Sequence, residues 1–173
     1  MPELIPVLDE NAIAQKVTEL ARKISLDYKD ADLVMIGVLK GAFVFMADLI
    51  RQIDIPSLRI DFVWVESYGC KSESTGCIRL LKDIQIDIRG RDILIVEDIY
   101  DSGLTLAYLR KHLEARGPRS IKICAMIDKR ERRQVDVAVD YVCHSVEKGF
   151  LVGYGLDYAE DYRQLPGIYH LVL

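Results

Sequence analysis

The sequence has 173 residues, of which half are hydrophobic and 29% are charged, and its formal net charge at pH 7 is −4. This length predicts one domain with a sizeable core, and the composition excludes a disordered chain. The negative charge argues against a protein built mainly to coat nucleic acid, although local lysines and arginines can still form a phosphate site.

The first part of the chain predicts two helices separated by a buried strand. Asp9 is a candidate N-cap, and apolar residues then recur at helical spacing: Ile13, Val17, Leu20, Ala21 and Ile24. Residues 33–38 form an apolar run, which is typical of a strand buried on both faces of a sheet. After a short turn, residues 42–53 predict a buried helix.

The next segment predicts strands around a polar connection. Residues 58–65 mix alternation with β-branched and aromatic residues, which favours a strand. Residues 66–77 lose all apolar periodicity, as is typical of a lid or a disordered loop. Strand character resumes at 78–81 and 84–88, and a turn at 89–91 leads into the central strand.

The second half again alternates strands and helices. A helix carries Leu106, Leu109 and Leu113 on one side and stops near Gly117. Strands are predicted at residues 93–96, 121–127, 137–146 and 168–173. This alternation predicts an α/β fold with a mostly parallel sheet and helices on both faces.

The segment after the central strand carries the chemistry. Acidic and small residues replace the aliphatic run before the helix begins, namely Glu97, Asp98, Asp101, Ser102, Gly103 and Thr105. Open α/β sheets bind ligands in loops at the carboxyl ends of their strands. Small hydroxyl residues and a glycine at a helix start can direct several backbone N–H groups at one phosphate. Acidic residues beside such a cradle suit sugar hydroxyls, a metal ion or proton transfer.

Residues 97–105, Glu-Asp-Ile-Tyr-Asp-Ser-Gly-Leu-Thr, closely resemble the 5-phosphoribosyl-1-pyrophosphate (PRPP) motif of the type I phosphoribosyltransferases, in the form found in hypoxanthine-guanine members. The resemblance extends from about Gly37 to the end of the chain. It implies a single domain, residues 1–173, with a small hood built from the C-terminal segment and N-terminal residues. A flexible loop at about 66–77 and a base-binding hood at about 147–173 are also implied.

The implied activity is purine salvage, in which the phosphoribosyl group of PRPP passes to N9 of hypoxanthine or guanine and pyrophosphate leaves. The 5-phosphate would lie on Asp101, Ser102, Gly103, Leu104 and Thr105. Pyrophosphate would contact Leu39, Lys40, Gly41 and Arg163, with a cis peptide bond between Leu39 and Lys40. Glu97 and Asp98 would hold the ribose hydroxyls, and the residues associated with the cofactor Mg²⁺ would be Glu97, Asp98 and Asp157.

The resemblance also assigns the purine side of the site. Lys129 matches a lysine that donates to the purine O6, which favours 6-oxopurines over adenine. Phe150 would stack on the base, and Leu151 would offer backbone groups to its edge. Asp101 would lie near N7 as a general acid/base.

Ser67 and Tyr68 resemble the pair that begins the family's mobile loop, which closes over the reacting centre and excludes water. Two positions depart from the family pattern: Tyr100 is often aliphatic, and Leu104 replaces a lysine found in some members. Both are expected to tune affinity. Arg130, Arg132 and Arg133 are equally consistent with a solvated charged segment.

Two alternatives share the same fold: a xanthine-preferring phosphoribosyltransferase, and an RNA-binding regulator of a pyrimidine operon. The acidic balance and Asp101 argue against the regulator, whereas xanthine stays open. The sequence contains neither a P-loop nor a dinucleotide-binding glycine motif, and its three histidines show no metal or triad spacing.

The remaining expectations concern surroundings and partners. No apolar run approaches the ~20 residues that span a bilayer, and the N-terminus lacks a signal-peptide pattern. The four cysteines lack C-x-x-C spacing, with Cys124 and Cys143 inside predicted strands, so a reducing cytoplasm is expected. We expect no membrane or nucleic-acid partner, and the resemblance implies a homodimer or homotetramer.

Overall fold

The computed structural model describes residues 2–68 and 77–172. Its strands are β1 Glu3–Leu8, β2 Leu33–Leu39, β3 Leu58–Tyr68, β4 Cys77–Lys82, β5 Asp92–Tyr100, β6 Ser120–Lys129, β7 Tyr141–Val146, β8 Leu151–Val152 and β9 Ile168–Val172. Its helices are α1 Glu10–Asp27, α2 Phe43–Ile50 and α3 Leu104–Glu114. Over these residues, a six-stranded sheet has the order β4-β3-β2-β5-β6-β7, and every neighbouring pair except β3–β4 is parallel. The predicted α/β class is therefore confirmed.

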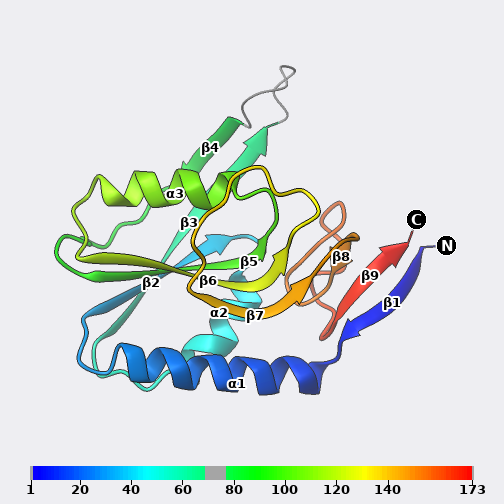
Figure 1. The fold of residues 1–173 in the computed structure, drawn as a ribbon, viewed down its shortest axis with the longest axis horizontal. Helices are drawn as coiled ribbons and strands as arrows, with labels where there is room; N and C mark the ends of the chain where they lie inside the picture. Colours follow the sequence, from blue (N-terminus) through cyan, green and yellow to red (C-terminus); the bar gives the residue numbers. More distant parts are fainter. Residues whose placement is uncertain (1, 69–76, 173) are drawn as a thin grey trace.

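Helices cover both faces of this sheet, as the alternation predicted (Figure 1). α1 begins after Asp9, whose carboxylate accepts a hydrogen bond from the Ala12 N–H at 2.7 Å. The buried faces of α1 and α2 share one hydrophobic cluster, and α3 belongs to a second. Because successive strand side chains point to opposite faces, Leu94 joins the first cluster and Ile95 the second. This two-sided packing fixes β5 and the loop at its carboxyl end.

The two ends of the chain meet in a smaller sheet with the strand order β1-β9-β8. β1 pairs antiparallel with β9, with Glu3 opposite Val172, and β9 pairs antiparallel with β8. The N-terminal and C-terminal strands consequently lie side by side in Figure 1. The expected hood from both ends of the chain is present, although its first strand was not predicted from the apolar pattern.

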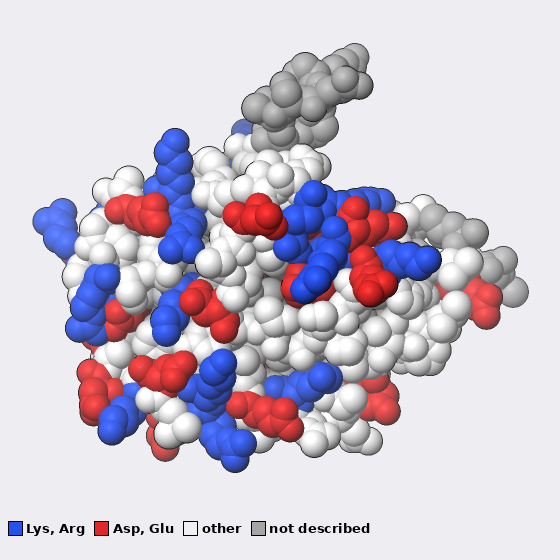
Figure 2. Space-filling view, viewed as in Figure 1, with Lys and Arg blue, Asp and Glu red and all other residues white. Residues whose placement is uncertain are grey.

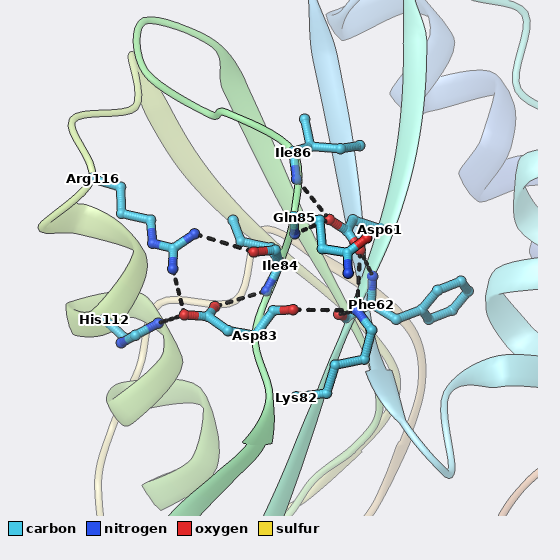
Figure 3. Close-up of polar contacts among 9 residues, drawn as sticks. All are labelled: Asp61, Phe62, Lys82, Asp83, Ile84, Gln85, Ile86, His112 and Arg116. Carbon is cyan, nitrogen blue, oxygen red and sulfur yellow. Dashed lines mark hydrogen bonds and ion pairs between the residues drawn. The ribbon is translucent and has the colours of Figure 1, made fainter.

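The prediction of a strand at residues 84–88 is wrong, because a side chain bonds this backbone instead of a neighbouring strand. The Asp61 carboxylate accepts hydrogen bonds from the Gln85 N–H at 2.6 Å and the Ile86 N–H at 3.0 Å (Figure 3). The first and last residues of the segment are nevertheless buried isoleucines. Burial without sheet pairing explains the apolar pattern.

A second carboxylate in Figure 3 attaches this region to α3. Asp83 lies 3.0 Å from His112 Nε2 and forms an ion pair with Arg116, and both partners come from or just after α3. α3 is thus fastened at its C-terminal end, away from the loop that precedes it.

Other boundaries also differ from the sequence prediction, and the central strand β5 runs to Tyr100 rather than ending at residue 96. α2 ends at Ile50 rather than residue 53, β3 continues to Tyr68, and β7 begins at Tyr141 rather than residue 137. The start of the strand predicted at residues 137–146 lies outside the sheet, and there the Val137 N–H donates to the Tyr100 hydroxyl at 2.8 Å. The predicted loop at 66–77 overlaps strands at both ends, and residues 69–76, including Cys70, lie outside the described residues.

The two described thiols agree with the expectation of structural cysteines. Cys124 in β6 is buried and Cys143 in β7 is half-buried. Burial raises the pKa of the Cys124 thiol, and burial raises the pKa of Cys143 to about 12. Both groups therefore stay protonated and unreactive near neutral pH.

Candidate active site

A cleft of about 640 Å³ opens at the carboxyl ends of β2 and β5. Its lining includes most of the residues predicted from sequence: Leu39, Lys40, Gly41, Ser67, Glu97, Asp98, Asp101, Ser102, Gly103, Leu104, Thr105, Asp157 and Arg163. Within the described part of the chain, Lys129, Phe150 and Leu151 lie outside this lining. Residues far apart in the sequence thus converge on one cavity, at the sheet edge where α/β proteins bind ligands.

The loop from Asp101 to Thr105 forms a concave turn at the start of α3. Gly103 has φ +84°, and a Cβ atom there would lie 2.0 Å from the Val135 carbonyl oxygen. The Ser102 carbonyl accepts hydrogen bonds from the Gln134 and Val135 N–H groups at 2.9 and 3.0 Å. The first N–H groups of a helix have no partner within the helix, so this turn can receive an anion.

Glu97, which is buried, and Asp98, which is half-buried, form an acidic pair near the end of β5. Burial and the neighbouring Asp98 raise the pKa of Glu97 well above its usual value, and burial raises that of Asp98. The loop after β2 packs directly on this pair, since a Cβ atom on Gly41 would lie 1.6 Å from Asp98 Oδ2. A pair held in this way favours a bound cation or a hydrogen-bond donor that compensates its charge.

The carboxylates predicted to bind magnesium line the same cleft. In the described ranges, however, no three His, Cys, Asp or Glu side chains are grouped so as to hold a metal ion. Asp157 instead pairs with Arg163 at 2.8 Å. Carboxylates that line one cleft are oxygen donors of the kind that Mg²⁺ prefers together with phosphate oxygens and water.

The two predicted pyrophosphate-binding cations meet at Glu160. Its carboxylate lies 2.8 Å from Lys40 Nζ and 3.2 Å from Arg163 Nη2. The peptide bond between Leu39 and Lys40 is cis, as the resemblance implied. Arg163 also donates to the Gly155 carbonyl at 2.7 Å, and its buried Nε has no hydrogen-bond partner among the described residues.

At the other end of the site, a buried lysine faces the acid of the cradle. Lys129 is 4% exposed, and its Nζ lies 3.2 Å from Asp101 Oδ2 and 3.3 Å from the Gly149 carbonyl oxygen. Asp101 Oδ1 is buried and lacks a hydrogen-bond partner in the described part of the chain. A buried acceptor of this kind indicates a missing donor, such as one on a ligand.

Two aromatic rings, Phe150 and Tyr158, pack together, and Phe150 directly follows Gly149, whose carbonyl oxygen contacts Lys129. Phe150 is 40% exposed and meets the Tyr158 ring edge-on, with ring centroids 5.5 Å apart. Leu151 follows in β8, with its side chain buried. An exposed ring supported by a second ring suits stacking on a planar ligand.

Sequence reasoning missed several residues that surround the cradle. Arg132 and Gln134 line the cleft, and the Arg133 guanidinium lies 3.3 Å from the centre of the Tyr100 ring. The interpretation of Arg133 as solvated is wrong, since its side chain is only 17% exposed. The available signal was that Arg133 follows the predicted strand at residues 121–127. Sequence alone did not show that the loop after this strand lies beside the acidic loop after the central strand.

Comparisons with known proteins agree with this geometry. A family model described as a phosphoribosyl transferase domain matches residues 6–159. Hypoxanthine phosphoribosyltransferase of Salmonella typhimurium is 46% identical over 169 residues, covering 96% of this chain and 94% of the relative. Hypoxanthine-guanine phosphoribosyltransferase of Bacillus subtilis is 48% identical over 162 residues, covering 94% and 89%. A crystal structure of a Bacillus anthracis hypoxanthine-guanine phosphoribosyltransferase has a TM-score of 0.91 and 43% identity, covering 99% of this chain and 100% of that one.

Proposed function

This chain belongs to the phosphoribosyltransferase family, and we propose that it transfers the phosphoribosyl group of PRPP to N9 of hypoxanthine or guanine. The products are IMP or GMP and pyrophosphate. One observation carries the proposal: Asp101 begins the phosphate cradle and also pairs with the buried Lys129 at 3.2 Å. A single carboxylate therefore joins a sugar-phosphate site to a site for a carbonyl-bearing base.

The PRPP half of the assignment rests on the cradle and the acidic pair. The 5-phosphate accepts hydrogen bonds from the turn at Asp101 to Thr105, where the start of α3 adds a favourable dipole. Glu97 and Asp98 accept hydrogen bonds from the ribose hydroxyls. Lys40 and Arg163 pair with the pyrophosphate, and the buried Arg163 Nε, which has no hydrogen-bond partner in residues 2–68 and 77–172, supports this role.

The carboxylates of the cleft also fit a magnesium ion that is bound jointly by the protein and the substrate. Glu97, Asp98 and Asp157 are oxygen donors on one cleft, and burial raises the pKa values of Glu97 and Asp98, so a bound cation would favour their charged forms. Mg²⁺ prefers a few carboxylates combined with phosphate oxygens and water. When bound there, it supplies positive charge against the pyrophosphate.

The base half selects 6-oxopurines. Lys129 donates a hydrogen bond to O6 of the base. Adenine carries an amine at this position, and an amine cannot accept that bond. Phe150 stacks on the ring, supported by Tyr158, while the Leu151 backbone meets the base edge. Asp101 Oδ1 faces N7 and exchanges a proton there or stabilises its positive charge.

Turnover then depends on orientation and on charge placement. The anomeric carbon loses pyrophosphate through an oxocarbenium-like state and is attacked by N9 with inversion of configuration. Lys40 and Arg163 stabilise the leaving charge. Positioning and electrostatics of this kind supply most of the rate enhancement.

We extend the proposal to the chain's surroundings. It acts as a single domain, residues 1–173, in the cytoplasm, as a homodimer or homotetramer. The two described thiols, Cys124 and Cys143, stay protonated near neutral pH and support a reducing compartment. No helix in the described ranges is long and apolar enough to cross a membrane. On the face in Figure 2, basic and acidic side chains are interspersed, which does not favour an RNA-binding role.

The test is pyrophosphate release from PRPP and Mg²⁺, with hypoxanthine, guanine, xanthine and adenine in separate reactions. Turnover with the first two and not with adenine is the expected result. A faster reaction with xanthine would reassign the subclass. PRPP binding without turnover on any base would instead point to a regulator with this fold.

A further inference from the structure

Arg133 occupies the segment between β6 and β7, directly behind the phosphate cradle. Its guanidinium stacks on the Tyr100 ring, 3.3 Å from the ring centre. The side chain is 17% exposed and pairs with Asp128 Oδ1 at 2.6 Å. A desolvated arginine with both a stacking and a carboxylate partner is held in one orientation.

The same guanidinium reaches the backbone of both halves of the site. Nε donates to the Asp101 carbonyl at 2.9 Å, and Nη2 donates to the Tyr100 carbonyl at 3.2 Å. Nη2 also donates to the Lys129 carbonyl at 3.0 Å. One planar group thus ties the end of β5, which carries Asp101, to the end of β6, which carries Lys129.

Tyr100 adds a second attachment to this arrangement. Its hydroxyl accepts a hydrogen bond from the Val137 N–H at 2.8 Å and donates to the Val135 carbonyl at 3.4 Å. Val135 in turn lies against Gly103 and donates to the Ser102 carbonyl. The stacked pair of Tyr100 and Arg133 therefore holds the backbone segment around Val135, and this segment packs against the cradle.

We propose that Arg133 is a positioning residue that fixes Asp101 relative to Lys129, and so sets the spacing between bound PRPP and bound purine. This inference rests on the proposed function. Arg133 touches no reacting atom. It can still affect the rate, because misplacement of a catalytic group by about 1 Å can slow a reaction on the order of 100-fold. A lysine cannot replace it, because one ammonium lacks the flat, forked set of donors.

The test compares R133K and R133Q with R130Q, a control at the exposed neighbour Arg130. For R133K and R133Q we expect kcat to fall about 10- to 100-fold, as is typical when supporting hydrogen bonds are lost. The KM for PRPP should change by less than about threefold, since the cradle's own N–H groups remain. R130Q should match the wild type.

Two further measurements separate positioning from folding. Melting temperatures identify any variant that fails to fold, and R133K then decides the matter because it keeps the charge and most of the volume. In R133A, added guanidinium chloride at low concentration should restore part of kcat, whereas sodium chloride should not. Wild-type kcat in folded R133K would overturn the inference, as would a loss that appears only in the KM for PRPP. An inactive wild type would instead refute the proposed function.

Discussion

Lys129 Nζ lies 3.2 Å from Asp101 Oδ2. This ion pair joins the carboxyl ends of the adjacent parallel strands β5 and β6. The other Asp101 oxygen is buried and has no partner among the described residues. The lysine thus fixes one oxygen of the Asp101 carboxylate. This geometry gives separate expectations for the two side chains.

Asp101→Asn should lower kcat by about 100- to 10,000-fold, the usual contribution of a general acid or base. PRPP affinity should change by less than about threefold, because in the proposed site the cradle binds phosphate through backbone N–H groups. Steady-state kinetics and PRPP titration measure the two effects. Asp30→Asn, at a side chain that is 86% exposed, is the control. Equal turnover in Asp101→Asn would remove this residue from the mechanism.

Lys129→Gln should weaken use of hypoxanthine far more than use of adenine. A charged hydrogen bond is worth about 1.5–3 kcal/mol, so kcat/KM for hypoxanthine should fall on the order of 10- to 100-fold. The hypoxanthine-to-adenine ratio of kcat/KM is the measurement, with exposed Lys111→Gln as the control. An unchanged ratio would show that Lys129 does not recognise O6.

Glu97 should make stability depend on pH. Burial raises its folded-state pKa well above the usual 4.5, so the folded protein binds a proton more tightly than the unfolded chain. The free energy of unfolding should therefore fall as the pH rises from 4.5 through the folded-state pKa, and then level off. Glu97→Gln should flatten this slope in denaturant titrations at several pH values without metal. Identical slopes would contradict the expectation.

Gly41→Ala should disrupt the contact between the loop after β2 and Asp98. The new Cβ would lie 1.6 Å from Asp98 Oδ2, and overpacking of this kind costs about 1–3 kcal/mol. We expect the KM for PRPP to rise about 10-fold or more. Gly90→Ala is the control, since nothing lies within 4 Å of its Cβ, and it should alter only the melting temperature. A normal KM in Gly41→Ala would show that the loop adapts.

Glu160→Gln should strengthen pyrophosphate binding. Glu160 now pairs with Lys40 and Arg163, so an incoming pyrophosphate must displace its carboxylate. Because Lys40 and Glu160 are largely exposed, we expect a change of only about two- to fivefold in the inhibition constant of pyrophosphate. Product-inhibition kinetics at two salt concentrations measure it. Weaker binding in the variant would mean that Glu160 orients the cations.

The sequence predicted the fold and the main elements well where the pattern was long and regular. The apolar stripe of α1, its Asp9 N-cap and the continuous strands β2, β5 and β6 are all present. Predictions were wrong where a side chain supplied the backbone partner. Asp61 accepts hydrogen bonds from the Gln85 and Ile86 N–H groups, and the Tyr100 hydroxyl accepts one from Val137, so apolar spacing alone misidentified strands there.

The chain itself determined which residues could bind PRPP, because the acidic pair, the cradle and its helix are contiguous and local backbone geometry depends on nearby residues. Only the tertiary structure decided how the distant parts meet. The sequence at Arg133 was equally consistent with a solvated segment. Because β6 packs beside β5, however, the side chain of Arg133, just after β6, lies against Tyr100. Glu160 had no assigned role, yet the fold places it between Lys40 and Arg163. Such contacts depend on strand order and burial, and these properties arise only when the whole sheet assembles.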